Sequence, residues 1–140
     1  MNEIIVKEEK NIENMIYEVR GKQVMLDRDL AILYKCKNGT KVINQAVSRH
    51  INRFPADFCF KLTREEYYDI LRSQNVTLEL EQGKYSKYLA YDFTEQGVAM
   101  LATIIKTEVA AAVSIDIMRA FSLMRKYLGT NMLEQKYINN

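Results

Sequence analysis

Ten candidate contact residues, all of them polar, lie in one short stretch of the chain, between residues 35 and 53. Lysine and arginine neutralise phosphates, and asparagine, glutamine and arginine form paired hydrogen bonds with base edges. The only acidic side chain between Tyr34 and Phe60 is Asp57. These residue types therefore favour contact with a nucleic acid. The candidate contact residues are Lys35, Lys37, Lys41, Asn44, Gln45, Ser48, Arg49, His50, Asn52 and Arg53.

The candidates divide by the contact that each type can make. Asn44 and Gln45 could pair with adenine edges, and Arg49 could pair with guanine. The remaining cations suit phosphates, and they are Lys35, Lys37, Lys41 and Arg53. His50, the only histidine, is either a boundary residue or a further contact to phosphate or base. A solvated helix face can have a similar composition, so a purely structural role for the stretch stays open.

A pair of short helices is predicted to position these residues. The first spans residues 28–35 and the second 41–52, with Thr40 as the N-cap of the second. The turn between them contains Gly39, which supplies a positive φ if one is needed. The apolar positions of the second helix are Ile43, Val47, Ile51 and Phe54. The basic and amide side chains then fall on the opposite side, as in a helix-turn-helix whose second helix enters the major groove of DNA.

Around this pair the chain alternates short strands and helices. The pattern predicts a small α+β domain over residues 15–128, with a flexible lead-in at 1–14 and a mobile tail at 129–140. The other predicted elements are a hairpin over 15–26, a strand at 58–62, a helix at 64–73 opened by the capping box Thr63–Glu66, a loop or ribbon at 74–87, a strand at 88–93, a helix from Thr94 to Ile105, and a long helix over 108–128 that Gly129 ends.

The long helix is apolar around much of its circumference. One stripe consists of Val109, Val113, Ile117, Ala120, Phe121, Met124 and Leu128. A second group lies beside it, so the helix must bury more than one face. It is either central in the domain or packed against a second copy, and the two are compatible. The candidate dimer-interface residues are Ile115, Met118, Ser122 and Leu123.

Composition and charge agree with one domain of a globular protein. The 140 residues are 48% hydrophobic and 27% charged, with a net charge of +2. The charge is uneven, because residues 20–53 carry a net +6 and the remainder −4. Such an asymmetry is the electrostatic pattern expected of a nucleic-acid-binding surface.

The same residues argue against several other classes of protein. His50 has no cysteine or carboxylate at ligand spacing, and no phosphate-binding glycine motif is present, so we expect no enzyme, no metal site and no cofactor. Cys36 and Cys59 lack a CxxC spacing and suggest a reducing compartment. With no signal-peptide pattern and no apolar run near 20 residues, we expect a cytoplasmic protein that does not contact a membrane.

Several sequence motifs in fixed order resemble a known family. They are Leu-Ala-Ile-Leu-Tyr34, Val42-Ile-Asn-Gln-Ala-Val47, Asn52-Arg-Phe-Pro-Ala-Asp-Phe58, Phe60-Lys-Leu-Thr63, Phe93-Thr-Glu-Gln-Gly-Val-Ala-Met-Leu101 and Val113-Ser-Ile-Asp-Ile-Met-Arg-Ala-Phe121. Together they resemble the "ORF-six-N" branch of the KilA N-terminal (KilA-N) domain superfamily, over about residues 15–128. The resemblance implies a small α+β DNA-binding domain of phages and prophages, often fused to a variable module in antirepressor-like proteins.

Two functional hypotheses follow. The first is a double-stranded DNA-binding regulatory protein of phage or prophage origin, which contacts DNA through the basic helix 41–52 and acts as a homodimer. The alternative is an antirepressor-like protein-interaction module, in which the C-terminal helix binds a repressor or a host regulatory protein and the basic helix is merely solvated.

Overall fold

The computed structural model describes residues 11–73 and 90–138, and it describes side chains as far as Leu128. Its centre is a four-stranded antiparallel sheet with the order β1 (Ile16–Val19), β2 (Lys22–Leu26), β4 (Tyr91–Thr94) and β3 (Cys59–Lys61). The described residues also form five α-helices and two 3-10 helices, η1 (Ile12–Met15), α2 (Asp27–Leu33), α3 (Thr40–Arg49), η2 (Ile51–Arg53), α4 (Arg64–Ser73), α6 (Glu95–Ala102) and α7 (Glu108–Ile138). The predicted α+β class is confirmed.

The first two strands form the predicted hairpin over residues 15–26. Arg20 and Gly21 occupy its two-residue turn, and both have positive φ angles, of 55° and 76°. Positive φ at both central residues is typical of a type I′ turn, whose twist matches that of the flanking strands. The hairpin continues into the sheet, because Met25 pairs with Phe93 of β4.

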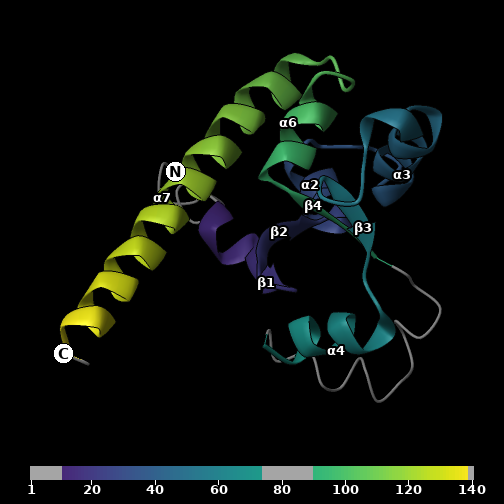
Figure 1. Cartoon of the computed structure of the whole chain (residues 1–140). Coiled ribbons are helices and arrows are strands. Elements are labelled where there is room, and N and C mark those ends of the chain that lie inside the picture. The colour runs from purple at the N-terminus through teal and green to yellow at the C-terminus, as the bar shows by residue number, and fades with distance from the viewer. Residues whose placement is uncertain (1–10, 74–89, 139–140) are drawn as a thin grey trace, which may run out of the picture.

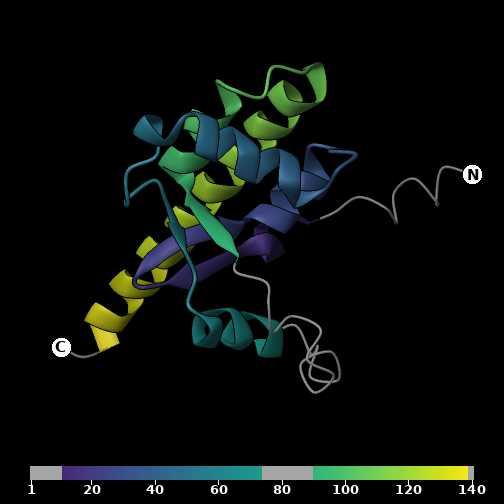
Figure 2. The ribbon, with the colours of Figure 1, turned by 90° about the vertical axis from the view of Figure 1, so that its right-hand side faces the viewer.

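Helices cover both faces of the sheet. Side chains alternate along each strand, so one row of residues faces each side. One row packs with α2, α3, α6 and α7, and its members are Ile16, Met25, Phe93 and Cys59. The opposite face, with Val24, Leu26 and partly buried Phe60, packs against Tyr67, Ile70 and Leu71 of α4. Figures 1 and 2 show the sheet between α4 on one side and the other helices on the other.

Helix capping agrees with the sequence at the starts of α4 and α6. Thr63 Oγ1 accepts a hydrogen bond from Glu66 N at 3.1 Å, and Glu66 Oε1 accepts one from Thr63 N at 2.8 Å, as a capping box requires. Thr94 caps α6 by accepting from Gly97 N. The prediction that Thr40 caps α3 is wrong, because Gly39 with φ 61° is the N-cap and Thr40 is already helical.

Several helix ends differ from the sequence-based boundaries. α2 ends at Leu33 and not at residue 35, and α6 ends at Ala102 and not at Ile105. The helix expected over 41–52 ends at Arg49 and is followed by η2, because His50 leaves the helical conformation at φ −128°. Asn52 and Arg53 therefore lie on η2. The predicted stop at Gly129 is also wrong, since α7 continues to Ile138. One glycine costs a helix interior only about 1 kcal/mol relative to alanine, and helix-favouring Leu, Glu, Gln and Lys follow it.

The remaining predicted segments agree in type with the structure where it describes them. The strand predicted at 88–93 is β4 at Tyr91–Thr94, and the loop predicted at 74–87 lies outside the described residues. Part of the predicted lead-in is η1, whose N-cap Asn11 accepts a hydrogen bond from Glu13 N. None of the helices in the described ranges has a window long and apolar enough to cross a membrane.

Candidate nucleic-acid interface

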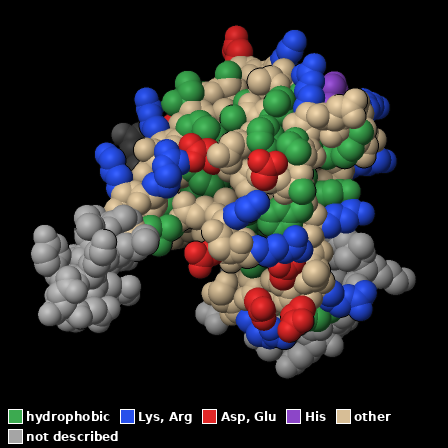
Figure 3. Space-filling view, viewed as in Figure 1, with side chains coloured by type: hydrophobic (Ala, Val, Ile, Leu, Met, Phe, Trp, Pro, Cys, Tyr) green, Lys and Arg blue, Asp and Glu red, His purple; other side chains and the backbone are tan. Residues whose placement is uncertain are grey.

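α3 separates its apolar and polar side chains onto opposite faces, as predicted. The exception is Ile51, expected on the apolar face, which lies on η2 and is 62% exposed because the helix ends before it. Ile43 is fully buried and Val47 is 3% exposed. The exposed side chains of the helix are Lys41, Gln45, Ser48 and Arg49. Figure 3 shows lysine and arginine side chains gathered along the upper right edge of the molecule, where Figure 1 places α3, with no acidic side chain among them. The helix therefore presents a basic and amide-rich face outward.

α2 holds α3 in place from the inside of the domain. Leu30, Ala31 and Tyr34 share one buried cluster with Ile43 and Val47. The Tyr34 hydroxyl also lies 3.1 Å from Ser114 Oγ of α7, and burial raises the pKa of this tyrosine. The two-helix unit is thus packed against the sheet and tied to α7. This contact has no signal in the sequence, because Tyr34 and Ser114 lie 80 residues apart.

The connection between α2 and α3 is set by local hydrogen bonds. Cys36 N donates to Ala31 O at 3.0 Å and Lys35 N donates to Ile32 O at 3.1 Å, the pattern of a Schellman motif. Lys35 occupies the left-handed position of this motif with φ 56°. The turn exposes Lys35 and Lys37 beside the start of α3. These two cations therefore extend the exposed basic face of α3 beyond its first residue.

The start of α3 favours an anion. Its first turn contains Lys41 and no acidic residue, and among the described residues its N-cap, Gly39, provides no side-chain hydrogen bond to the N–H groups. Uncapped N–H groups and the helix dipole both attract phosphate at a helix N-terminus. Within the described ranges, five cations near this helix form no ion pair, namely Lys35, Lys37, Lys41, Arg49 and Arg53.

His50, Asn44 and Asn52, three of the predicted contact residues, are not exposed side chains of α3. The Nδ1 atom of half-buried His50 lies 3.0 Å from Ala46 O, so this nitrogen is engaged at the end of α3. Asn44 is half-buried, and its Oδ1 is buried without a hydrogen-bond partner in the described structure. A paired contact to adenine needs that oxygen exposed, so this conformation of Asn44 does not provide it. Asn52 is exposed, but on η2 beyond the helix.

A second network fixes the loop that follows α3 and η2. Thr94 Oγ1 donates to Asp57 O at 2.8 Å, and Thr94 N donates to Phe58 O at 3.0 Å. Gly97 lies so close to this loop that a Cβ atom there would be 1.9 Å from Phe58 O. The FTEQG stretch of the sequence therefore packs against the chain leaving the basic helix. Its glycine is required by close approach of two backbones.

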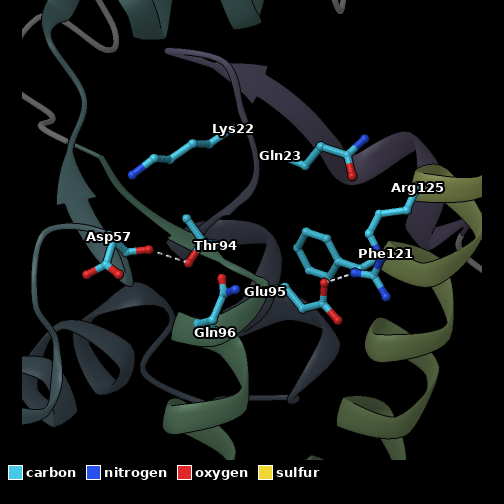
Figure 4. A pocket seen from close by; sticks show the side chains of 8 residues that line it. All are labelled: Lys22, Gln23, Asp57, Thr94, Glu95, Gln96, Phe121 and Arg125. Atoms are coloured by element: carbon cyan, nitrogen blue, oxygen red, sulfur yellow. Dashed lines mark hydrogen bonds and ion pairs between the residues drawn. The ribbon is translucent and has the colours of Figure 1, made fainter. Parts of the chain in front are cut away.

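Between α6, α7 and the hairpin lies a hollow of about 330 Å³. It is lined by Lys22, Gln23, Asp57, Thr94, Glu95, Gln96, Phe121 and Arg125 (Figure 4). Arg125 Nη1 pairs with the Glu95 carboxylate across it. The two charges neutralise each other and join α7 to α6, so the hollow offers no charge of one sign to a ligand. No group of three or more His, Cys, Asp or Glu in the described ranges could hold a metal ion.

The candidate dimer-interface residues fall into two groups on α7. Ile115 and Leu123 are 54% and 43% exposed. Met118 and Ser122 are half-buried, and Met118 packs against the main core. In the predicted apolar stripe of α7, Ile117, Ala120 and Phe121 are buried, whereas Val109 and Leu128 are exposed. The inner face of the helix is centred on Ala110, Ser114, Ile117 and Phe121.

The fold and the basic helix belong to a stretch that matches a known protein family. The ORF6N domain model matches residues 14–104. The matched range includes the sheet, α2, α3, α4 and α6, and it ends before α7. The motif quoted at Val113–Phe121 therefore lies outside it. No curated protein and no solved structure matched the chain. Since the model covers more than half of the residues, the chain belongs to the ORF6N domain family.

Proposed function

We propose that this ORF6N domain binds double-stranded DNA through the exposed face of α3 and serves as a regulatory protein of phage or prophage origin. The observation that carries the proposal is the set of five cations on and beside α3 that form no ion pair within the described ranges. Cations without an acidic partner keep their attraction for phosphate, and two of these, Lys41 and Arg49, project from a helix whose other face is buried. The resemblance to the KilA-N superfamily points in the same direction.

We expect different residues of this face to contact the bases and the phosphates of the duplex. Gln45, Ser48 and Arg49 lie along the outer side of α3, where hydrogen bonds to base edges in the major groove are within the reach of a docked helix. Lys35, Lys37 and Lys41 surround the N-terminal end of α3 and suit phosphates on one side of the groove. Arg53, on η2, lies beyond the C-terminal end of α3 and suits a phosphate of the DNA backbone there.

The test is fluorescence anisotropy with a random-sequence duplex at two salt concentrations. Counterion release predicts steep weakening with salt, with a log–log slope corresponding to roughly 3–6 phosphates for each protomer. The variant Lys37→Ala/Lys41→Ala/Arg49→Ala should lose most of this binding. Arg49→Ala or Gln45→Ala alone should also relax specificity once a preferred site is known.

A matched control removes the same charge from elsewhere. Lys22, Lys61 and Arg64 are exposed on β2, β3 and α4. The variant Lys22→Ala/Lys61→Ala/Arg64→Ala therefore has the same net charge as the α3 variant but an intact α3 face. If both triple variants bind equally weakly, the attraction comes from net charge alone. If the α3 variant binds as the parent does, the proposed face is wrong.

A second candidate function is supported by the exposed apolar residues of α7. Ile115 and Leu123 project from that helix, and such side chains are common at protein interfaces. An antirepressor-like module would bind a repressor or host regulator there, with little dependence on salt. Loss of protein-partner binding in Ile115→Glu, together with no DNA binding at low salt, would favour this function over the first.

A further inference from the structure

β1 forms one edge of the sheet, whose strand order is β1-β2-β4-β3. Next to the turn of the hairpin Val19 pairs with Lys22, and the following pair joins Glu18 to Gln23. Hydrogen-bonded and non-hydrogen-bonded pairs alternate along antiparallel strands, and the pair that closes a two-residue turn is hydrogen-bonded. The backbone N–H and C=O groups of Glu18 therefore point away from β2, toward the open edge. Neither group has a further backbone hydrogen bond among the described residues.

A hollow of about 410 Å³ lies beside this edge, between β1 and α4. Side chains alternate along β1, so Tyr17 and Val19 face α4, and Glu18 points to the other side of the sheet. The residues of α4 that line the hollow are Glu66, Asp69, Ile70 and Ser73. A strand added to β1 would therefore direct every second side chain into a space with apolar side chains on both walls.

Of the four charged residues that line the hollow, three already form ion pairs. Arg20 pairs with Glu66 at 2.8 Å, and Asp69 pairs with Arg72 at 2.6 Å. The fourth, Glu18, is exposed and forms no ion pair within the described ranges. Its carboxylate therefore remains available to a basic side chain directly opposite it on an added strand, where opposite charges attract.

We propose that an extended basic segment of a partner protein adds to β1 as a fifth strand, with a lysine or arginine opposite Glu18 and apolar side chains on either side of it. Main-chain hydrogen bonds to Glu18 supply affinity in this mode of recognition, and the alternating side chains supply specificity. A second copy of β1 is a poor occupant, because antiparallel pairing would bring Glu18 opposite Glu18. The site is independent of the function proposed for α3.

The probe is a short fluorescent peptide in which valine and lysine alternate, and anisotropy measures its binding to the parent chain. Binding should saturate, and a peptide with glutamate in place of lysine should not bind. In the proposed pairing the lysine amides face β1 and the valine amides face solvent. N-methylation of the lysine amides should therefore abolish binding, whereas N-methylation of the valine amides should preserve it. Equal binding of both methylated peptides would overturn strand addition, because charge alone would then explain the attraction.

Substitutions at Glu18 separate the contribution of its charge from that of its backbone. Glu18→Gln should weaken peptide binding about threefold and Glu18→Lys about tenfold, because the second replaces attraction by repulsion. Glu18→Pro also removes the outward N–H group, which β2 does not use, and should bind about tenfold more weakly than Glu18→Gln. Glu108→Lys makes the same charge change on α7 and should bind as the parent does. Circular dichroism establishes that each variant is folded.

Amide exchange measured by nuclear magnetic resonance locates the bound peptide, since exchange of the Glu18 amide should slow when the peptide is added. The variant Lys37→Ala/Lys41→Ala/Arg49→Ala should bind the peptide as the parent does, even if it has lost DNA. A parent chain that binds no alternating peptide, or a Glu18 amide that the peptide does not protect, would overturn the proposal. Sedimentation equilibrium tests the other occupant. A dimer that Glu18→Pro converts into a monomer would assign the edge to a second copy and overturn the proposed partner.

Discussion

Cations serve opposite purposes on the two sides of the sheet. On the side covered by α4, Arg20 donates two hydrogen bonds of 2.8 Å to the Glu66 carboxylate and lies 4.4 Å from the centre of the Phe60 ring. Beside α3, Lys37, Lys41 and Arg49 have no such partner in the described structure. The first cation contributes to folding and the others remain available to a ligand. The difference shows that pairing, and not residue type, separates structural cations from candidate binding ones.

The largest expected effect on stability comes from a substitution in the packing that supports the α3 side of the sheet. Gly97→Ala places a Cβ atom 1.9 Å from the Phe58 carbonyl oxygen, so α6 or the loop must move. Backbone-limited overpacking costs about 3 kcal/mol or more, and we expect a large fall in the urea midpoint. The neighbouring, exposed Gln96→Ala serves as the control. An unchanged midpoint in Gly97→Ala would show that the two segments do not pack as described.

Two substitutions, one on each side of the sheet, test whether the paired and unpaired cations have different roles. Arg20→Ala removes a two-point hydrogen-bonded ion pair, and it should lower the urea midpoint without changing DNA affinity. Lys41→Ala should leave stability unchanged and reduce the salt slope of DNA binding by about one phosphate. Urea unfolding and anisotropy on both variants check this. If each variant affected both quantities, the two classes of cation would not be separate.

The α4 side should also differ in its response to pH. Asp92 is fully buried beneath α4, and its carboxylate oxygens have no hydrogen-bond partner in the described structure. Burial raises its pKa to about 7, the Glu66 charge adds to the rise, and the Arg20 charge opposes it. A raised pKa means that the folded state keeps a proton that the unfolded chain releases near pH 4. Stability from this group is therefore complete below pH 4 and is lost as pH rises to about 7.

Thermal unfolding across pH measures this loss. The melting temperature of the parent should fall between pH 4 and pH 7, and Asp92→Asn should flatten that part of the profile. Glu66 acts in the opposite direction at lower pH, because Arg20 holds its pKa at about 2 and its stabilisation is lost as pH falls from about 4.5. A parent profile that is flat between pH 4 and pH 7 would contradict the buried protonated Asp92.

The smallest expected effect concerns the turn before α3. Lys35 has a φ of 56°, a conformation that glycine adopts without strain. Lys35→Gly should raise the free energy of unfolding by up to about 1 kcal/mol and slightly weaken DNA binding through the loss of one cation. Urea unfolding measures the first effect and anisotropy the second. Lower stability in this variant would mean that the lysine side chain makes a contact that the turn needs.

Local signals predicted much of the fold. The Arg20–Gly21 turn, the Thr63–Glu66 capping box and the spacing of Ile43 and Val47 depend on near neighbours, and the hairpin, α4 and α3 follow them. The start of α3 was misplaced because Gly39 and Thr40 are both acceptable caps, and only the backbone angle decides between them. Gly129 was over-interpreted as a stop, since a single glycine does not outweigh the residues around it.

Features that depend on distant parts of the chain could not be predicted in this way. The contact of Gly97 with Phe58, the Tyr34–Ser114 hydrogen bond and the burial of Asp92 each join elements that lie far apart in sequence. The polar residues of the candidate interface could be predicted from residue type. Which cations form an ion pair could not, because the partner can lie far away in sequence. The buried oxygen of Asn44 is another example, because its burial depends on how α3 packs against the domain.

The hydrogen bond between Tyr34 and Ser114 gives the α2–α3 unit a direct link to α7. Ser114 lies on the inner face of α7, and Tyr34 ends the helix that supports α3. If binding of a protein partner to the exposed side of α7 rotates that helix, the rotation would reach the α2–α3 unit through this hydrogen bond. Occupancy at the two sites would then be thermodynamically linked, each binding event changing the affinity of the other by the same factor.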